Sequence, residues 1–429
     1  MANARLVAVR AVMAVESKEG YSNLVLSGML ADAALSAADR ALATRIFYGT
    51  LDRQITLSYI LNQFLKKPLK KVKPFCRAVL ETALYQIIYA ERIPNSAAVN
   101  EAVKLMKNSK ERYQAAFVNG VLRQILRQGY ELPQGEDVTS LSVRYSCPER
   151  IVRSFLADYG QETAISLLEQ SLLEPAVYLR VNTVKTTVPQ LCERLRAESV
   201  ETECCSTENA LRVVGGMDVA QCGAYRDGLF HVQDLASQKA LAIFNPQKNE
   251  RVLDLCAAPG GKTFTMAEMM ENQGEVTAYE LHESRVSLIQ QGAGRLGLSI
   301  VSATQGDSTV MDPQQKESFD AVLCDVPCSG WGVLRRKPEL KYRLPESFEE
   351  LEQTQQKILA CGAAAVKKGG RLLYSTCTLR RAENETAVRT FLKNHSEFKL
   401  QTEKTFFPHI DGTDGFFCAL FIKAGEEHT

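Results

Sequence analysis

The stretch that decides the fold is Asp254-Leu255-Cys256-Ala257-Ala258-Pro259-Gly260-Gly261-Lys262-Thr263. It ends an apolar run expected to form a strand and precedes a segment with helical periodicity. Its two glycines have no Cβ atoms, so the backbone can approach a ligand closely. A strand, a glycine-containing loop and a helix in this order are typical of a nucleotide-type site in an α/β domain.

Strand and helix patterns alternate after this loop, as in a parallel sheet with helices on both faces. The expected strands are Arg251–Leu255, Glu275–Glu280, Ile300–Gln305, Phe319–Asp325 and Arg371–Thr376, with two late strands near Phe398–Thr402 and Phe416–Ile422. Residues 236–424 are therefore expected to form an α/β domain of Rossmann type. Residues 146–235 mix shorter helical and strand patterns and are expected to form a small α+β subdomain, with strands at Tyr178–Asn182, Leu211–Val214 and Leu229–Asp234.

Acidic side chains stand at or directly after the ends of several strands: Asp254, Glu280, Asp307 and Asp325. Open parallel sheets bind ligands at these ends. Glu280 lies 19 residues after Gly261, where an acid can accept hydrogen bonds from ribose hydroxyls, and Asp307 can accept from an adenine amino group. Each acid alone could instead cap a helix, but their joint placement favours a nucleoside ligand.

Three nucleotide ligands compete for this loop. A dinucleotide is disfavoured because Gly-x-Gly-x-x-Gly is absent, and a phosphate loop for ATP needs a glycine where Cys256 stands. S-adenosylmethionine needs no phosphate cradle and is the expected cofactor. The residues expected to bind it are Cys256, Ala257, Ala258, Pro259, Gly260, Gly261, Lys262, Glu280, Asp307 and Asp325.

Two cysteines follow two further strands: Cys328 in Asp325-Val326-Pro327-Cys328-Ser329 and Cys377 in Tyr374-Ser375-Thr376-Cys377-Thr378. A thiolate that attacks C6 of a cytosine turns C5 into a nucleophile that can accept a methyl group. One thiol is enough for attack, and a second suggests that attack and release are divided between them. The spacing leaves open which cysteine attacks. Because only the ionised thiol reacts, a polar and partly open pocket is expected.

The first 130 residues have nearly continuous helical periodicity, with Ser36 as an expected N-cap before an apolar run to Leu65 and Pro74 in a first turn. A polar linker is expected over 131–145. Residues 1–130 carry 19 Lys and Arg against 9 Asp and Glu, while the remainder carries 32 against 41. A basic module joined to an acidic one indicates a polyanion held by the first and chemistry done by the second. The alternative is a solvated basic face.

This helical part, expected to be a domain over 1–135, resembles the NusB family of RNA-binding domains. The resemblance rests on the order of short pieces, namely Asp39-Arg40, Phe47-Tyr48-Gly49-Thr50-Leu51, Leu84-Tyr85-Gln86-Ile87-Ile88-Tyr89, Ile93-Pro94, Val99-Asn100-Glu101-Ala102-Val103 and Phe117-Val118-Asn119-Gly120-Val121-Leu122. An all-α bundle that binds RNA is the implied structure. For Asn100 and Asn119 a hydrogen bond inside the bundle is preferred over RNA contact.

The rest of the chain is similar to the RNA cytosine-C5 methyltransferases of the NOL/NOP/sun family. The matching motifs are Asp254–Thr263, Gln305–Asp307, Asp325–Gly330 and Tyr374–Cys377. Together with the NusB-like part, they imply transfer of a methyl group from S-adenosylmethionine to C5 of a cytosine in 16S ribosomal RNA, by resemblance cytosine 967.

The resemblance assigns the attack to Cys377, through a covalent Cys377–C6 intermediate, whereas DNA cytosine methyltransferases use the Pro-Cys cysteine, here Cys328. Asp325 is then expected to hold N3 of the ring protonated. Glu280, Val326 and Trp331 depart from the usual family pattern, in which aspartate, alanine and a smaller residue stand at these positions.

Composition narrows the class of protein further. At 429 residues, with 45% hydrophobic and 24% charged residues and no long apolar run, the chain is expected to fold into several domains without a membrane span. Twelve dispersed cysteines without an export signal indicate reduced thiols in the cytoplasm. No Cys-x-x-Cys pair occurs and there are five histidines, so no metal site is expected.

The expected partner is 16S ribosomal RNA, not DNA or a membrane, and the protein is expected to be a monomer. A basic segment beside Cys328 is expected to contact phosphates, or else to be a solvated connection; it contains Arg335, Arg336, Lys337, Lys341 and Arg343. Two rival functions are an RNA-binding or transcription factor with an inactive methyltransferase domain, and a P-loop-like ATPase. Cys256 opposes the ATPase, and the retained Cys328, Asp325 and Cys377 oppose the inactive domain.

Overall fold

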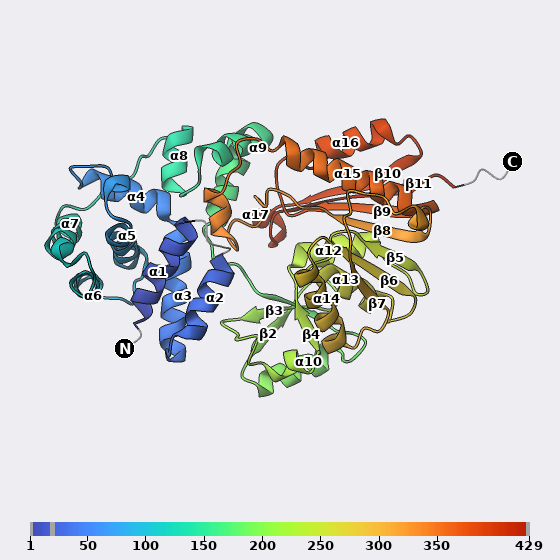
Figure 1. The fold of residues 1–429 in the computed structure, drawn as a ribbon, viewed down its shortest axis with the longest axis horizontal. Coiled ribbons are helices and arrows are strands. Elements are labelled where there is room, and N and C mark those ends of the chain that lie inside the picture. Colours follow the sequence, from blue (N-terminus) through green and yellow to red (C-terminus); the bar gives the residue numbers. More distant parts are fainter. Residues whose placement is uncertain (1–2, 18–21, 426–429) are drawn as a thin grey trace. The chain divides into compact units, whose positions relative to one another are not determined.

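The computed structural model describes residues 3–17 and 22–425, and the chain divides into two compact units (Figure 1). The first unit, which we call the helical unit, contains the described residues up to Leu173 and the segment Leu334–Leu344. The second, which we call the sheet unit, contains Glu174–Val333 and Pro345 onward. The chain therefore passes between the units three times. We call the segment 334–344 the strap.

The helical unit has no strand among its described residues. Its helices are α1 (Ala4–Glu16), α2 (Ser22–Asp32), α3 (Ala37–Asp52), α4 (Gln54–Gln63), α5 (Pro74–Tyr89), α6 (Asn95–Lys107), α7 (Ala115–Gln128), α8 (Val138–Arg144) and α9 (Glu149–Gln170), with 3-10 turns η1 (Leu69–Lys71), η2 (Arg112–Gln114) and, in the strap, η4 (Pro338–Tyr342). The expected N-cap is confirmed, because the Asp39 amide donates to Ser36 Oγ at 3.1 Å. Pro74 begins α5 as expected. The apolar run to Leu65, in contrast, forms two helices that meet at Arg53.

Helix α5 lies at the centre of the helical unit. Every residue from Ala78 to Gln86 is buried, and α1, α3, α4, α6 and α7 all contact this helix. Gly49 of α3 allows close approach, since a Cβ atom there would overlap the ring of Tyr85. The polar stretch 131–145, expected as a linker, contains α8, whose N-cap Asp137 accepts hydrogen bonds from two backbone amides.

The sheet unit contains a small antiparallel sheet with strand order β2-β3-β1-β4. Its strands are β1 (Tyr178–Val181), β2 (Glu201–Cys204), β3 (Ala210–Val214) and β4 (Phe230–Val232), accompanied by α10 (Val188–Ala197) and α11 (Gly223–Arg226). The sequence predicts three of these strands and misses β2. Strand β2 lies at the sheet edge with mostly exposed side chains, so it lacks the apolar alternation that marks a strand.

A larger sheet of seven strands has the order β10-β11-β9-β8-β5-β6-β7. The strands are β5 (Arg251–Asp254), β6 (Glu275–Glu280), β7 (Val301–Gln305), β8 (Phe319–Asp325), β9 (Val366–Thr376), β10 (Phe398–Phe406) and β11 (Phe416–Lys423). Strands β5 to β9 pair in parallel, and β11 joins β9 antiparallel. The expected fold class is confirmed. Strand β9 begins at Val366, before the expected Arg371.

Helices cover both faces of the large sheet (Figure 1). One core cluster joins the strands to α12 (Leu235–Phe244), α13 (Gly261–Met269) and α14 (Glu283–Leu296), and another joins them to α15 (Glu349–Ala365) and α16 (Glu385–Asn394). The remaining short elements are η3 (Pro313–Gln315) and α17 (Pro408–Asp411). Strand β5 pairs with β6 on one side and β8 on the other, which makes its carboxyl end the switch point where open sheets bind ligands.

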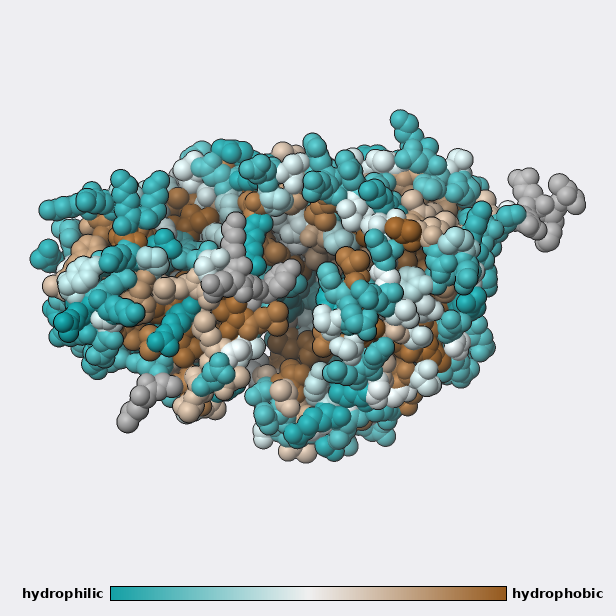
Figure 2. All heavy atoms as spheres, viewed as in Figure 1, coloured by the Kyte–Doolittle hydropathy of each residue, from teal (hydrophilic) through white to brown (hydrophobic). Residues whose placement is uncertain are grey.

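The visible surface carries mostly hydrophilic residues, with hydrophobic ones scattered between them (Figure 2). Within the ranges 3–17 and 22–425, no helix has the length and apolar character to cross a membrane. No group of three or more His, Cys, Asp or Glu side chains in the same ranges is arranged to hold a metal ion.

Candidate active site

The loop between β5 and α13 is fixed at its start by Asp254. This buried carboxylate accepts hydrogen bonds from Thr263 Oγ1 at 2.7 Å and from the Cys256 amide at 3.4 Å. Burial raises the pKa of Asp254 to about 7. At the other end of the loop, Gly260 has φ of +107°, and a Cβ atom there would overlap the ring of Phe264. The loop therefore needs glycine at this position.

Glu280, at the end of β6, is buried and reaches the same loop through Arg285. Its Oε1 accepts from Arg285 Nη1 at 3.1 Å and from the His282 amide at 3.2 Å, and Arg285 Nη2 donates to the Ala258 carbonyl at 2.9 Å. One carboxylate oxygen thus orders the start of α14. Glu280 therefore lies beside the loop, and its role in binding ribose stays a prediction.

Asp307 is exposed beyond the end of β7. Its Oδ1 accepts from the amide of Thr309 at 2.9 Å and from the hydroxyl of Thr309 at 2.7 Å. The hydroxyl hydrogen bond lowers the pKa of Asp307, so this group is anionic at neutral pH. The neighbouring Ser308 hydroxyl donates to the Leu255 carbonyl, which ties this turn to the loop after β5.

The loop between β5 and α13, which we call the donor loop, is connected to the two cysteine motifs by Asp325 at the end of β8. Its Oδ2 accepts from Lys262 Nζ at 2.7 Å and its Oδ1 from Ser375 Oγ at 2.7 Å. Burial lowers the pKa of Lys262, but the charge of Asp325 and its hydrogen bond outweigh burial, so the net shift is upward. Lys262 therefore carries a positive charge beside Asp325, with its Nζ 5.2 Å from the centre of the Phe416 ring.

Cys328 and Cys377 follow the neighbouring parallel strands β8 and β9, and the structure brings them together. Their Sγ atoms are 3.1 Å apart, too far for a disulfide and close enough for a hydrogen bond. Both side chains are partly buried. The hydrogen bond to Cys377, together with burial, raises the pKa of Cys328 well above its usual value. Cys328 is thus a thiol that can donate to the Cys377 sulfur.

The turn around Cys328 is held by Glu383, a fully buried residue that the sequence analysis missed. Glu383 Oε2 accepts from the Ser329 amide at 2.9 Å and from Gln355 Nε2 at 2.8 Å, while Oε1 pairs with Arg380 Nη1 at 2.8 Å. Gln355 Nε2 also donates to the Pro327 carbonyl at 2.9 Å. Three donors therefore meet one buried carboxylate behind the cysteine.

The turn around Cys377 is held by Asn384, which was also missed. Its Oδ1 accepts from Thr376 Oγ1 at 2.6 Å and its Nδ2 donates to the Thr378 carbonyl at 2.9 Å. The two turns are joined directly, since the hydroxyls of Ser329 and Thr378 lie 2.7 Å apart. The only available sequence signal was the polar pair at 383–384 shortly after the Thr-Cys motif, which also suits an ordinary helix start.

The small sheet supports the helix that begins in the donor loop. Glu268 of α13 is fully buried, with Oε2 3.3 Å from Arg180 Nε and Oε1 3.3 Å from His231 Nδ1. His231 Nε2 lies 3.2 Å from Thr265 Oγ1, which also belongs to α13. These contacts connect β1 and β4 to α13 through charged and polar groups.

The basic segment after Cys328 differs from its expected role at one position. Lys341 is fully buried, and its Nζ donates to the Asp52 carbonyl at 3.4 Å, so the prediction that Lys341 contacts phosphate is wrong. Lys337 is exposed, while Arg335, Arg336 and Arg343 are partly buried.

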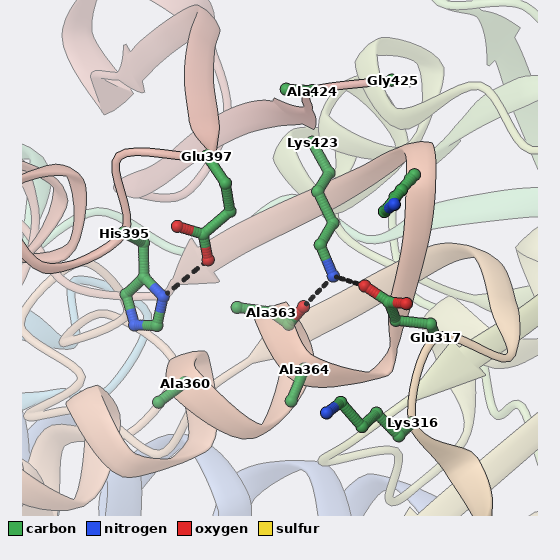
Figure 3. Close-up of a pocket in the computed structure, with 11 residues that line it drawn as sticks. Lys316, Glu317, Ala360, Ala363, Ala364, His395, Glu397, Lys423, Ala424 and Gly425 are labelled. Atoms are coloured by element: carbon green, nitrogen blue, oxygen red, sulfur yellow. Dashed lines mark hydrogen bonds and ion pairs between the residues drawn. The ribbon is translucent and has the colours of Figure 1, made fainter. Parts of the chain in front are cut away.

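The pocket drawn in Figure 3 has a volume of about 500 Å³ and is lined by residues of α15, by the end of β11, by His395 and Glu397 before β10, and by Lys316 and Glu317. Lys423 Nζ donates three hydrogen bonds, to Glu317 Oε1 at 3.0 Å and to the carbonyls of Ala363 at 3.2 Å and Val366 at 2.8 Å. His395 pairs with Glu397 at 3.2 Å. Because Lys423 fastens the last strand to α15, we regard this pocket as structural.

Comparison with protein families gives three matches along the chain. Residues 2–127 match the NusB family, residues 147–220 match the ferredoxin-like domain of RsmF/B-like methyltransferases, and residues 241–422 match the 16S rRNA methyltransferase RsmB/F family. The order agrees with the resemblances drawn from the sequence.

Relatives of similar length match over nearly the whole chain. The probable ribosomal RNA small subunit methyltransferase B of Bacillus subtilis is 39% identical, covering 98% of this chain and 99% of the relative. The corresponding Synechocystis protein is 34% identical, covering 99% and 100%. Among solved structures, PH0851 is similar with a TM-score of 0.83 and 27% identity over 97% of this chain and 98% of that chain.

The donor loop and its acids fit S-adenosylmethionine, and the matches extend from the helical bundle to the last strand. The chain therefore belongs to the ribosomal RNA small subunit methyltransferase B family of S-adenosylmethionine-dependent enzymes.

Proposed function

We propose that this enzyme methylates C5 of a cytosine in 16S ribosomal RNA and that Cys377 is the nucleophile. The observation that carries the proposal is the 3.1 Å separation of Cys328 Sγ and Cys377 Sγ beside the Asp325–Lys262 pair. Two thiols at one site serve no purpose in methylation of an amino or hydroxyl group. Where a carbon atom must first be activated by a covalent bond, one thiol can form that bond and a second can assist its release.

Cys377 attacks as the thiolate, and its neighbours favour that form. Cys328 remains a thiol and can donate a hydrogen bond to the Cys377 sulfur, and the charge of Cys377 is among the causes that raise the pKa of Lys262. A nearby ammonium group stabilises an anionic sulfur. The charge of Lys262, together with the resemblance of Thr376-Cys377 to the family motif, supports attack by Cys377 over attack by Cys328.

The bonds change as follows. The Cys377 sulfur bonds to C6, and the displaced electron pair makes C5 nucleophilic while Asp325 holds the protonated N3. S-adenosylmethionine supplies the electrophilic methyl group. A water molecule takes the proton from C5, the electrons of that C–H bond re-form the C5–C6 double bond, the Cys377 thiolate leaves C6, and N3 gives up its proton. Cys328, in contact with that sulfur, assists this release.

We further propose that the helical unit binds the RNA through a basic and aromatic surface. Tyr113 and Phe117 are exposed by 64% and 41%, and Lys73 Nζ lies 5.4 Å from the centre of the Tyr113 ring. The stretches that lead to Lys73 and to Tyr113 in the sequence carry further exposed cations: Lys66, Lys67, Lys70, Lys71, Lys107, Lys110 and Arg112. Exposed aromatic rings among cations suit unpaired RNA, whose bases stack while its phosphates are neutralised.

Methylation of deproteinised 16S RNA with labelled donor tests the reaction. We expect label on C5 of one cytosine, by family resemblance cytosine 967, and mapping of the modified base decides the position. Label on an exocyclic amine or a ribose hydroxyl would refute the chemistry. In a thermal melt, stabilisation by S-adenosylmethionine but not by ATP separates the methyltransferase from the ATPase alternative.

A further inference from the structure

The strap begins six residues after Cys328 and returns to the sheet unit at Pro345, yet it packs within the helical unit. Its tip, η4, closes the carboxyl-terminal end of α3. Tyr342 Oη donates to the Leu51 carbonyl at 2.8 Å, and Lys341 Nζ donates to the Asp52 carbonyl. The last carbonyls of a helix have no partners within the helix and bear a partial negative charge, so a hydroxyl and an ammonium group are well-suited partners.

A second contact fixes the tip to the start of α2. The buried Glu339 accepts from the Ser22 amide, at the start of α2, at 3.2 Å. Lys341 is the only fully buried lysine side chain among the largest fully buried side chains of the described residues, and Asp52 Oδ1 lies 3.7 Å from its Nζ. Burying an ammonium group is costly unless it is paired. The strap is therefore anchored by specific contacts and is not a solvated loop.

The residues that flank the strap on its two sides, which we call its roots, pack against each other in the sheet unit. Trp331 and Phe348, on either side of the strap, are buried and pack edge to face with ring centres 5.5 Å apart. The guanidinium of Arg380 lies 4.0 Å from the centre of the Phe348 ring and 5.3 Å from that of Trp331. Arg380 also pairs with Glu383, which holds the turn around Cys328.

One root also touches the proposed nucleophile's backbone. The Gly332 amide donates to the Cys377 carbonyl at 3.0 Å, and the Gly332 carbonyl accepts from the Gly415 amide at 2.8 Å. A Cβ atom at Gly332 would overlap the Gly415 carbonyl, so the root cannot shift without moving this backbone. The strap roots thus contact the supports of both cysteines, one through Arg380 and one through Gly332.

We propose that the strap is a tether through which the helical unit positions Cys328 and Cys377, and that Lys341 and Tyr342 are positioning residues for methyl transfer. The inference rests on the proposed function of the two cysteines. The chain is continuous from the anchored η4 to the packed residues on either side of the strap, so loosening η4 lets those residues shift. Because reaction needs a sulfur held close to C6, a small displacement of the turns lowers the rate of the chemical step and not the binding of the donor.

The test compares Lys341→Met with Arg77→Met in the full-length protein. Lys341→Met keeps the buried stem and removes the charge of the anchor. Arg77→Met is the matched control, since it breaks the Arg77–Glu16 pair of the same unit, 2.5 Å between Nη2 and Oε2, and Arg77 forms no hydrogen bond or ion pair with the strap. Tyr342→Phe removes one hydroxyl as a milder second variant, and Lys341→Arg retains the charge.

For Lys341→Met we expect faster tryptic cleavage within the strap and altered emission of Trp331, the chain's single tryptophan. We expect kcat to fall by about ten- to a hundredfold while the affinity for S-adenosylmethionine and the KM for RNA stay unchanged. Tyr342→Phe should show the same pattern more weakly, Lys341→Arg should recover part of kcat, and Arg77→Met should show none of it.

A strap that is cut faster while kcat stays at the wild-type value would overturn the inference. So would an equal loss of kcat in Arg77→Met, which would indicate general destabilisation. If Lys341→Met does not fold, Tyr342→Phe against Arg77→Met decides by the same criteria. A failure of the proposed function can be told apart from a failure of the tether. The first shows as no C5 methylation by the wild-type protein, whereas strap cleavage and Trp331 emission still measure whether Lys341 anchors the strap.

Discussion

Replacing Glu383 with glutamine tests the buried carboxylate behind the cysteine turn. Glu383 is fully buried and receives three hydrogen bonds of 2.8–2.9 Å, from Ser329, Gln355 and Arg380. Both carboxylate oxygens of Glu383 accept hydrogen bonds, whereas glutamine has one accepting oxygen and an NH₂ group. That NH₂ group must therefore face at least one of the three donors. The guanidinium of Arg380 is then left without its buried counter-ion.

Removing one partner of a buried ion pair costs about 3–5 kcal/mol. In a unit of this size, 1 kcal/mol shifts the melting temperature by about 2–4 °C, so we expect a decrease of about 6–20 °C. Melting followed by the emission of Trp331 reports on the sheet unit, since this tryptophan is the only one in the chain and lies in that unit. Methyl transfer should fall as well, because the turn around Cys328 loses its support.

The matched control is Glu352→Gln, which removes the other carboxylate that pairs with Arg380. Glu352 is 35% exposed and its contact is 3.1 Å, so its loss should cost about 0–1 kcal/mol. A melting temperature for Glu383→Gln within 2 °C of that of Glu352→Gln would refute the energetic role assigned to Glu383.

Three further predictions concern both units. Cys377→Ser should abolish methylation and form no covalent RNA adduct, whereas Cys328→Ser should accumulate an adduct that survives a denaturing gel, because attack proceeds and release is slow. Tyr113→Ala should weaken RNA binding by about 1–3 kcal/mol at all salt concentrations, and Lys73→Gln should reduce the salt slope of log Kd by about one. Burial raises the pKa of Glu81 to about 8, so folding favours the protonated acid and the wild type should lose stability in thermal melts as pH rises toward 8. Glu81→Gln cannot ionise and should not show this loss.

Each of these has an outcome that would count against it. An adduct in Cys377→Ser and none in Cys328→Ser would exchange the two roles. Salt-independent RNA binding unaffected by Tyr113→Ala would place the RNA elsewhere. For Glu81, the carboxyl group binds its proton more tightly in the folded than in the unfolded state, so stability is fully present below the unfolded pKa and is lost as pH rises through the folded pKa of about 8. A glutamine variant with the same pH profile as the wild type would contradict this assignment.

The strands of the large sheet could be predicted because buried parallel strands are short apolar runs ended by polar residues. The placement of the candidate site residues at one edge of the sheet followed from the same rule, since the carboxyl ends of parallel strands share one edge. Glu383 and Asn384 could not be predicted, because the sequence does not show whether a polar side chain is buried. Only the fold determines which hydrogen-bond donors surround it. The strap shows the same limit: Lys341 stands among five cations in a segment that resembles a solvated loop, and its partly buried partner Asp52 is remote in the sequence.

The strap also affects the order in which the protein is completed on the ribosome. The helices of the first unit up to α9 emerge early, but the strap that caps α3 is synthesised only after the residues from Glu174 to Val333. At about 5–20 residues per second, this interval lasts roughly 10–30 s. During that time the end of α3 lacks two of its hydrogen-bond donors and the cation beside Asp52. The helical unit, although first in the chain, therefore reaches its final packing only after most of the sheet unit has been made, and a fragment ending at Leu173 would never reach it.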